Sequence, residues 1–388
     1  MIRKINDSVF EVGVRAPKKP IFDNLIPLPK GTSYNSYIIK GSEKIALIDT
    51  VEPEFWDEFW NNVKECLNGK KIDYLVSNHS EQDHSGCIPL ILKEFPDAKV
   101  IVNEKSKELL SSMIHLNENQ MIVISDNQEI SLGNKTFQFI LTPWVHWPET
   151  MCTYLKEDKI LFTCDFFGAH FSSDELYVKE PNVVLNEAKR YYAELMMAFR
   201  VVIKLNMKKL EKIKIDMIAP SHGQIYDNPK IIIDAYNQWI ADECESKVVI
   251  LYVTMHESTQ IMADFIANKL KEKTNVKLIN LSNVDLGDMA IELVDAKIVL
   301  LGSPAYITGP HPVAANAAYL ISVLKPKSKY IGFFGTYGWA NKLEEYLIHM
   351  TENISAERLP SMIIKGKPKE KDFEDMNKIV SDIILKLN

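Results

Sequence analysis

Cysteine is scarce in this sequence of 388 residues, and none of its five cysteines stands in a Cys-x-x-Cys pair. Their odd number and wide spacing argue against a disulfide framework or a thiolate-bound metal module. Long apolar runs are also missing, because no stretch approaches the roughly 20 apolar residues of a membrane span. Residues 1–20 lack the apolar core of a signal peptide. We therefore expect a cytoplasmic protein with no membrane partner.

Positive charge is not in excess either, since the formal net charge is −7. Nucleic acids and anionic lipid surfaces attract basic faces, so neither is expected as a partner. Apolar residues make up 46% and charged residues 25%, a balance typical of globular proteins. A chain of 388 residues exceeds the usual size of one hydrophobic core. Two domains are the natural expectation.

Residues 1–247 mix strand-like and helix-like patterns. Alternating residues on both sides of a turn at 40–41 predict an antiparallel hairpin, and aromatic residues at helical spacing predict a helix at 55–67. Short apolar runs predict strands at 72–76, 100–102, 137–141, 160–163 and 217–219, and a helical pattern covers 184–205. This mixture predicts sheets sandwiched between helices.

Residues 248–388 follow a more regular pattern of apolar strand, polar loop and helix. Strands are predicted at 248–253, 276–281, 298–301 and 330–334, and helices at 260–271, 313–324, 342–350 and 371–387. Such alternation predicts a second α/β domain built on a doubly wound parallel sheet.

The strongest local signal is the segment His79-Ser80-Glu81-Gln82-Asp83-His84, which follows an apolar strand. Four of its side chains can bind a metal ion, and a strand-to-loop turn allows them to converge. The alternative is an ordinary charged turn. Three further candidates, His146, Asp165 and His222, each come just after an apolar strand as well.

Together these seven side chains supply four imidazoles and three carboxylates. Seven ligands are too many for one tetrahedral ion and suit two ions that share one carboxylate. The sequence therefore predicts a two-metal site.

A second constellation lies in the loops that follow the strands of the C-terminal half. Thr254-Met255-His256-Glu257-Ser258-Thr259 precedes a helix, so its hydroxyl and amide groups could hold a phosphate without lysine or arginine. Simple helix capping explains this segment about equally well. Two later loops contain Ser303-Pro304-Ala305-Tyr306-Ile307 and Gly335-Thr336-Tyr337-Gly338-Trp339. Because ligands of open α/β sheets bind at this edge, their aromatic residues could contact a planar ring.

The first motif resembles the metallo-β-lactamase superfamily, and the second half resembles flavodoxin. In this order the two halves resemble flavodiiron proteins along essentially the whole chain. The resemblance implies an N-terminal metallo-β-lactamase-like αββα sandwich, residues 1–247, and a C-terminal flavodoxin-like FMN domain, residues 248–388. Glu81 replaces a histidine of the hydrolases, and this oxygen ligand favours iron over zinc.

Site roles also follow from the resemblance. It implies that His79, Glu81 and His146 bind one iron and that Asp83, His84 and His222 bind the other, with Asp165 bridging the pair. The FMN is expected in the three C-terminal loops named above. Tyr192 and His170 look like groups that donate hydrogen bonds or protons near the irons.

The implied activity is reduction of dioxygen to water, with reduction of nitric oxide to nitrous oxide as an additional or main activity. Two ferrous ions and one reduced FMN hold the four electrons that dioxygen needs. No rubredoxin-type module with paired Cys-x-x-Cys motifs is present in the sequence. We therefore expect an external donor, either a rubredoxin-type protein or a reduced deazaflavin coenzyme.

The resemblance also implies a head-to-tail homodimer, or a dimer of dimers, in which the FMN of one chain meets the irons of another. Two other functions remain open at this point. One is a dizinc hydrolase with a flavodoxin-like module, and the other is an electron carrier with a structural metal site.

Overall fold

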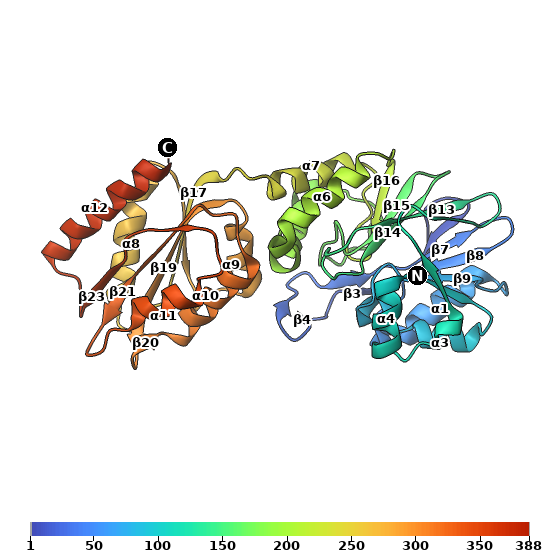
Figure 1. The fold of residues 1–388 in the computed structure, drawn as a ribbon, viewed down its shortest axis with the longest axis horizontal. Coiled ribbons are helices and arrows are strands. Elements are labelled where there is room, and N and C mark those ends of the chain that lie inside the picture. The colour runs from blue at the N-terminus through green and yellow to red at the C-terminus, as the bar shows by residue number, and fades with distance from the viewer. Residues whose placement is uncertain (1, 388) are drawn as a thin grey trace. The chain divides into compact units, whose positions relative to one another are not determined.

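The computed structural model describes residues 2–387 and shows two compact units (Figure 1). Unit 1 comprises the chain up to Tyr192 together with Phe199–Ile240. Unit 2 comprises Ala193–Ala198 together with the chain from Ala241 onward. Each unit has its own sheets and its own core.

Unit 1 contains a seven-stranded sheet with the strand order β1-β2-β7-β8-β9-β10-β11. Its strands are β1 (Arg3–Lys4), β2 (Val9–Glu11), β7 (Tyr37–Lys40), β8 (Ile45–Ile48), β9 (Tyr74–Val76), β10 (Lys99–Asn103) and β11 (Met121–Ile124). Strands β7 and β8 pair antiparallel, which confirms the predicted hairpin, and β8 to β11 run parallel.

The second sheet of unit 1 has the order β12-β13-β14-β15-β16. Its strands are β12 (Glu129–Ser131), β13 (Thr136–Leu141), β14 (Met151–Leu155), β15 (Ile160–Cys164) and β16 (Met217–Pro220). Two small hairpin-like pairs join β3 (Val14–Ala16) to β6 (Thr32–Tyr34) and β4 (Ile21–Phe22) to β5 (Ile26–Pro27).

The helices of unit 1 are α1 (Trp56–Leu67), α2 (Gln82–Ser85), α3 (Ile88–Glu94), α4 (Glu104–Met113), α5 (Pro181–Tyr191), α6 (Arg200–Leu210) and α7 (Lys230–Ile240), with short 3₁₀ turns at Pro53–Phe55 and Glu118–Gln120. The helical pattern at 184–205 is not one continuous α-helix. After α5 the chain forms a π-helical turn at Tyr192–Met196 and a 3₁₀ turn at Met197–Phe199. A wider turn shifts the helical phase, so a simple 3.6-residue pattern cannot place the side chains beyond it.

Alternation along the strands builds two cores in unit 1. Ile38, Leu47 and Leu75 face one core, which they share with α1, α3 and α4. Ile39, Ile48, Val76 and Ile101 face the other core, against Phe139 and Phe162 of the second sheet. Because neighbouring residues of a strand point to opposite faces, one sheet can pack on helices and on a second sheet at once. This arrangement is a sandwich of two sheets with helices outside.

Unit 2 contains a sheet with the order β18-β17-β19-β21-β22, and β23 also pairs with β21. Its strands are β17 (Glu245–Tyr252), β18 (Asn275–Asn280), β19 (Ala296–Tyr306), β20 (Gly309–Pro310), β21 (Tyr330–Tyr337), β22 (Glu357–Arg358) and β23 (Met362–Lys365). All pairs are parallel except the β19–β20 hairpin. The predicted doubly wound parallel sheet is thereby confirmed.

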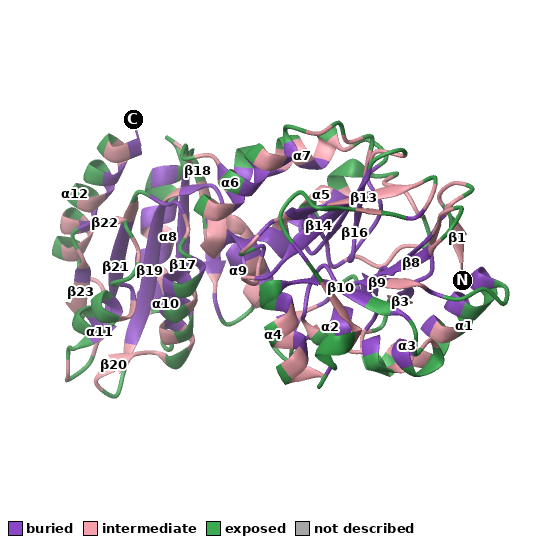
Figure 2. Ribbon diagram, turned by 45° about the vertical axis from the view of Figure 1, so that its right-hand side comes forward, coloured by how far each residue is buried: buried purple, intermediate pink, exposed green. Residues whose placement is uncertain are grey.

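Helices α8 (Ser258–Lys271), α9 (Leu286–Leu293), α10 (Pro312–Leu324), α11 (Leu343–Met350) and α12 (Glu370–Leu387) flank this sheet. The central strands β17, β19 and β21 are buried along most of their length, and the outer helix faces are exposed (Figure 2). Among these helices, only α9 was absent from the sequence prediction, because it is short and contains Gly287, a poor helix former.

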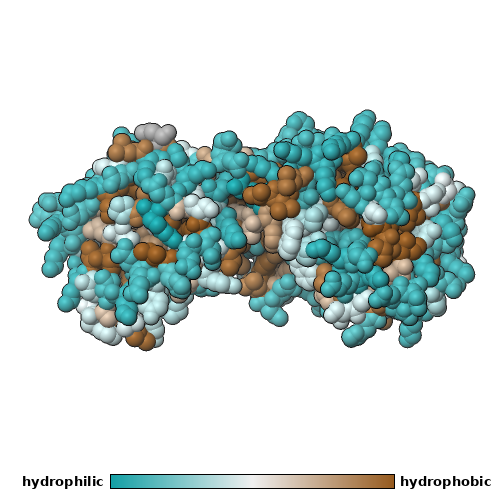
Figure 3. Space-filling view, viewed as in Figure 1, coloured by the Kyte–Doolittle hydropathy of each residue, from teal (hydrophilic) through white to brown (hydrophobic). Residues whose placement is uncertain are grey.

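The surface of each unit is mainly hydrophilic, with hydrophobic residues confined to small patches on the face shown (Figure 3). Within residues 2–387, no helix has the length and hydropathy needed to cross a membrane.

Candidate metal centre and flavin site

The seven predicted metal ligands come together in unit 1 at the ends of strands. His79 follows β9, and Glu81, Asp83 and His84 lie at or in the short helix α2. The other three come from the loops after β13, β15 and β16. Strand ends place these side chains together although they are far apart in the sequence.

The first group consists of His79, Glu81 and His146 with one oxygen of Asp165. Glu81 Oε2 lies 3.1 Å from His79 Nε2 and 3.2 Å from His146 Nε2. Asp165 Oδ2 lies 3.3 Å from the same two nitrogens. Atoms about 2.1 Å from one ion and at right angles to each other would lie about 3 Å apart, so these spacings suit a common ion.

The second group consists of Asp83, His84 and His222 with the other oxygen of Asp165. Asp83 Oδ2 lies 3.2 Å from His84 Nε2 and 3.3 Å from His222 Nε2. Asp165 Oδ1 lies 3.0 Å and 3.4 Å from these nitrogens. The two oxygens of Asp165 thus face different groups, as a bridging carboxylate would.

Within the described chain, several donor atoms of this cluster are buried without a hydrogen-bond partner. Both carboxylate oxygens of Asp83 and of Asp165 are buried without one among residues 2–387, and so is His84 Nε2. Burying charged oxygens without a partner is costly, and bound cations remove that cost. Since the ligands are oxygens and imidazoles without a thiolate, the set fits a pair of iron ions.

Side chains behind the ligands fix the orientation of two imidazoles. His79 Nδ1 donates to Glu149 Oε1 at 2.7 Å, and the amide of Ser80 donates to the same oxygen at 2.9 Å. His222 Nδ1 donates to the carbonyl oxygen of Ser33 at 2.7 Å. Both contacts leave Nε2 free to bind a metal, which is the usual role of such partners.

His170 lies beside the second group. Its ring centroid is 5.1 Å from that of His222, and its Nδ1 lies 3.0 Å from the hydroxyl of Thr32. Burial, together with the neighbouring His222, holds the pKa of His170 well below its usual value, so the ring is neutral. Its Nε2 is buried and has no partner in the described part of the chain.

Two adjacent tyrosines occupy different surroundings. The ring of Tyr191 lies 4.8 Å from that of His170 and 5.8 Å from that of His222. The ring of Tyr192, which the sequence analysis selected, lies 5.5 Å from Tyr236 and from Trp239. Burial and the charge of Asp165 raise the pKa of Tyr191, which therefore keeps its proton. Tyr191 was not among the predicted site residues, and the role of Tyr192 stays a prediction.

Unit 2 has a cavity of about 300 Å³ at the strand ends predicted to hold FMN. Three loops of the prediction contribute to it, and a fourth loop adds Gly366 and Lys367. Its lining consists of Thr254, Met255, His256, Ser258, Thr259, Pro304, Ala305, Ile307, Thr336, Tyr337, Gly338, Trp339, Gly366 and Lys367.

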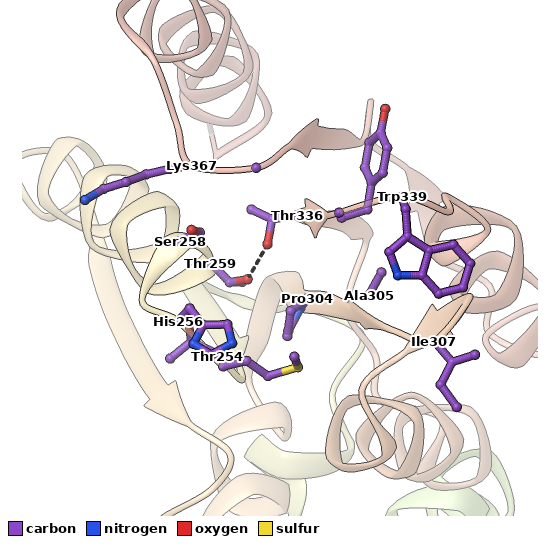
Figure 4. A pocket seen from close by; sticks show the side chains of 14 residues that line it. Thr254, His256, Ser258, Thr259, Pro304, Ala305, Ile307, Thr336, Trp339 and Lys367 are labelled. Atoms are coloured by element: carbon purple, nitrogen blue, oxygen red, sulfur yellow. Dashed lines mark hydrogen bonds between the residues drawn. The ribbon is translucent and has the colours of Figure 1, made fainter.

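Hydroxyl groups gather on one side of this cavity (Figure 4). Thr259 and Thr336 contact each other through hydroxyl oxygens 3.3 Å apart, and Ser258 begins helix α8 beside them. Thr254 Oγ1 is buried without a hydrogen-bond partner among residues 2–387. Trp339 and Ile307 lie on the opposite side (Figure 4). A phosphate on the hydroxyl side and an aromatic ring on the other would fit these surroundings.

Four residues of the predicted flavin set do not line the cavity. Glu257 has a left-handed backbone, with φ at 63°, and an exposed side chain. The hydroxyl of Ser303 accepts from the amide of His311 at 3.0 Å. A Cβ on Gly335 would stand 1.9 Å from the carbonyl oxygen of Ser303, so glycine is required for strand packing there. Tyr306 is 50% exposed on the β19–β20 hairpin.

Lys367 is the main addition to the predicted cavity lining. The phosphate loop was predicted to act without lysine or arginine, but this exposed lysine belongs to the lining through the loop after β23, and its amino end points away from the cavity in Figure 4. Gly366, with φ at 77°, turns the chain there, and its amide donates to the carbonyl oxygen of Tyr337 at 2.9 Å. The segment Lys365-Gly366-Lys367-Pro368 is typical of a turn. The loop that it contacts, at Tyr337, lies far away along the chain, so the sequence alone could not place this turn at the cavity.

A two-sheet metal domain joined to an FMN-type doubly wound domain defines a class of redox enzyme, and comparison with known proteins agrees. Residues 32–223 match the family model described as ODP family beta lactamase. A nitric oxide reductase of Moorella thermoacetica is 34% identical over 384 residues, 95% of each chain. A flavo-diiron protein of Clostridium acetobutylicum is 30% identical and covers 89% of each chain.

The solved structure of rubredoxin oxygen:oxidoreductase from the anaerobe Desulfovibrio gigas superposes with a TM-score of 0.96. It is 26% identical and covers 100% of this chain and 98% of its own. The chain belongs to the flavodiiron protein family. The predicted metallo-β-lactamase-like and flavodoxin-like fold is thereby confirmed, and so are the family's cofactors, FMN and a diiron site. Of the functions left open above, the relatives support the oxidoreductase.

Proposed function

We propose that this protein reduces dioxygen to water as its main activity and also reduces nitric oxide to nitrous oxide. The observation that carries the proposal is the division of seven buried donors into two groups around Asp165, in a chain that also has an FMN-type cavity. Reduced FMN and two ferrous ions supply the four electrons that dioxygen needs. Relatives named for reactions with both gases are consistent with this pair of activities.

The chain's own residues would hold the irons and supply protons. Asp165 would bridge the ions, with three further ligands for each, and Glu149 and the Ser33 carbonyl would fix the orientation of His79 and His222. Tyr191 keeps its phenolic proton near His222, and the neutral His170 ring lies beside it. We assign to Tyr191 and His170 the donation of hydrogen bonds or protons toward the gas. Tyr192 would support this region through its contacts with Tyr236 and Trp239.

In unit 2, the residues that line the cavity would bind FMN. Thr254, Ser258 and Thr259 would contact its phosphate, and Trp339 and Ile307 would lie against its ring. Trp339 is 75% exposed and Ile307 is 64% exposed, as expected of an apolar surface that another molecule covers. We propose that a second copy of the chain covers the part of this surface that the flavin leaves open, in a homodimer or a dimer of dimers.

Electrons would come from an external donor, either a rubredoxin-type protein or a reduced deazaflavin coenzyme. The decisive experiment mixes the reduced protein, loaded with iron and FMN, with each gas in an anaerobic stopped-flow instrument. We expect rapid reoxidation of FMN by dioxygen, a slower reaction with nitric oxide, and multiple turnovers with one of the two donors. Two bound zinc ions together with hydrolase activity, or no reaction with either gas, would refute the proposal.

A further inference from the structure

Glu149 is a buried carboxylate that contacts the predicted metal ligand His79, and the sequence prediction assigned it no role in the site. It lies in the loop between β13 and β14, three residues after His146, and its side chain has no exposed surface. Its Oε1 accepts from His79 Nδ1 and from the Ser80 amide, at 2.7 Å and 2.9 Å. Its Oε2 is buried without a partner among residues 2–387. Asn103 Nδ2 also donates to its backbone carbonyl, which holds the loop in place.

In the described part of the chain, no carboxylate accepts from an Nδ1 atom of the second group. His222 Nδ1 donates to a neutral carbonyl, that of Ser33. His84 Nδ1 has no hydrogen-bond partner in the part of the chain that the structure describes. Each group has one carboxylate of its own, Glu81 in the first and Asp83 in the second, and the two groups share Asp165. Glu149 adds a buried carboxylate that contacts an imidazole of the first group only.

A buried negative charge stabilises a ferric ion more than a ferrous ion, because the ferric ion has one more positive charge and solvent does not screen the interaction. A carboxylate that accepts from a ligand imidazole also makes that imidazole a stronger donor. We propose that Glu149 is a positioning residue that makes the two irons unequal, so that the iron bound by His79, Glu81 and His146 has the lower reduction potential. This inference rests on the diiron site of the proposed function.

The inference is tested by an anaerobic redox titration of the iron-loaded protein. The mixed-valence form, in which one iron has lost one electron to the mediator, is followed by electron paramagnetic resonance. Two independent sites of equal potential would give a statistical half of the protein in this form, and interaction between two bridged ions raises that yield even when the sites are equal. A yield at or below half in the native protein would overturn the inference, and a higher yield is then compared with that of a variant without the Glu149 charge.

Glu149→Gln keeps the size of the side chain and removes its charge. We expect the lower of the two iron couples to shift upward and the mixed-valence yield to fall, while the FMN couples stay unchanged. The matched control is Glu187→Gln, which changes another buried carboxylate of unit 1, one that pairs with Lys30 at 2.9 Å. The control should leave both iron couples in place.

Retention of two irons by Glu149→Gln with couples identical to those of the native protein would overturn the inference. Loss of one iron would overturn it as well, because a purely structural role of Glu149 gives that result. The outcome is independent of gas consumption. If the native protein turns over neither gas while Glu149→Gln shifts the lower iron couple, the proposed function alone is refuted. If the native protein is active while Glu149→Gln leaves both iron couples unchanged, this inference alone is refuted.

Discussion

The two proposed sites of this protein are built in different ways. The metal site of unit 1 is almost completely buried, and its seven donors are charged or ionisable side chains. The flavin cavity of unit 2 is wider, more exposed, and lined largely by hydroxyls, apolar side chains and loop backbone. The metal site depends on which side chains are present, whereas the flavin site depends on how loops are shaped.

This difference predicts how each site responds to mutation. Removing one ligand from a buried charged cluster should have a large effect, because neither water nor a neighbour can replace it. Removing one contact from an open cavity should have a smaller effect, because the remaining contacts and solvent compensate. The following changes would test that contrast.

The largest effect should come from Asp165→Ala, because its two oxygens face both groups of ligands. We expect iron affinity to fall at least about 100-fold and gas reduction to be lost, since even a residue behind a metal ligand typically contributes 10-fold or more. FMN should remain bound. Iron content, FMN absorbance and gas consumption of the purified variant measure the three effects.

Asp97→Ala is the control, because its carboxylate in the same unit is 95% exposed. It should retain two irons and normal turnover. If Asp165→Ala also kept both irons, the assignment of this residue as the shared ligand would be wrong.

Sequence alone predicted which side chains come together at the proposed metal site, for a physical reason. Histidines and carboxylates that directly follow apolar strands, such as His79 and His222, converge when parallel or neighbouring strands end at the same edge. The choice between Tyr191 and Tyr192 could not be made in this way. This choice depends on a π-helical turn that begins at Tyr192, and the local sequence pattern does not predict that turn.

A change with an intermediate effect is Thr254→Val in the flavin cavity. Its hydroxyl is buried without a partner, so replacement by an isosteric methyl should stabilise the FMN-free protein by about 1 kcal/mol. The same change should weaken FMN binding about 10-fold, because a hydrogen bond to a charged phosphate is lost. Thermal unfolding and fluorescence titration with FMN measure the two opposite effects.

Thr351→Val provides a matched comparison in the same unit. The hydroxyl of Thr351 is buried and already bonded, donating to the Leu347 carbonyl at 2.6 Å and accepting from Arg358 at 2.7 Å. This variant should be destabilised while its FMN affinity stays unchanged. Unchanged FMN affinity in Thr254→Val would remove Thr254 from the phosphate site.

The flavin site was predicted less completely, because its lining depends on loop geometry. The loop motifs identified Thr254, Thr259 and Thr336, which line the cavity. Two other residues of these motifs do not line it: Glu257 has an exposed side chain, and the hydroxyl of Ser303 accepts from the amide of His311. Lys367 was missed because the loop after β23 reaches the cavity only through the order of the strands. A doubly wound sheet brings such loops together without any nearby sequence signal.

A smaller effect is expected from Lys367→Gln. An exposed lysine near a phosphate contributes roughly 0.2–1 kcal/mol, so FMN should bind about threefold more weakly at low salt. High salt should abolish the difference, because it screens exposed charges. Riboflavin, which lacks the phosphate, should bind both proteins equally. Lys365→Gln, at the exposed end of β23, is the control, and an equal loss in that variant would indicate a general charge effect.

The smallest effect should come from a cluster of three charges in unit 2, in which the carboxylate of Glu292 is partly exposed, whereas the metal site of unit 1 is buried. Glu292 contacts Lys247 at 2.7 Å and Lys277 at 2.8 Å, and it remains 20% exposed. Burial opposes its ionisation, but the hydrogen bonds from the two lysines prevail and lower the pKa of Glu292. A lowered pKa stabilises the folded state above the unfolded value of about 4.3, and this contribution disappears as the pH falls through the folded value. Glu292→Gln should therefore lower the free energy of unfolding by about 1 kcal/mol or less at pH 7, and the difference from the native protein should vanish at the acid end of a urea titration series. A difference that persisted in acid would mean that packing of this side chain, and not its charge, stabilises unit 2.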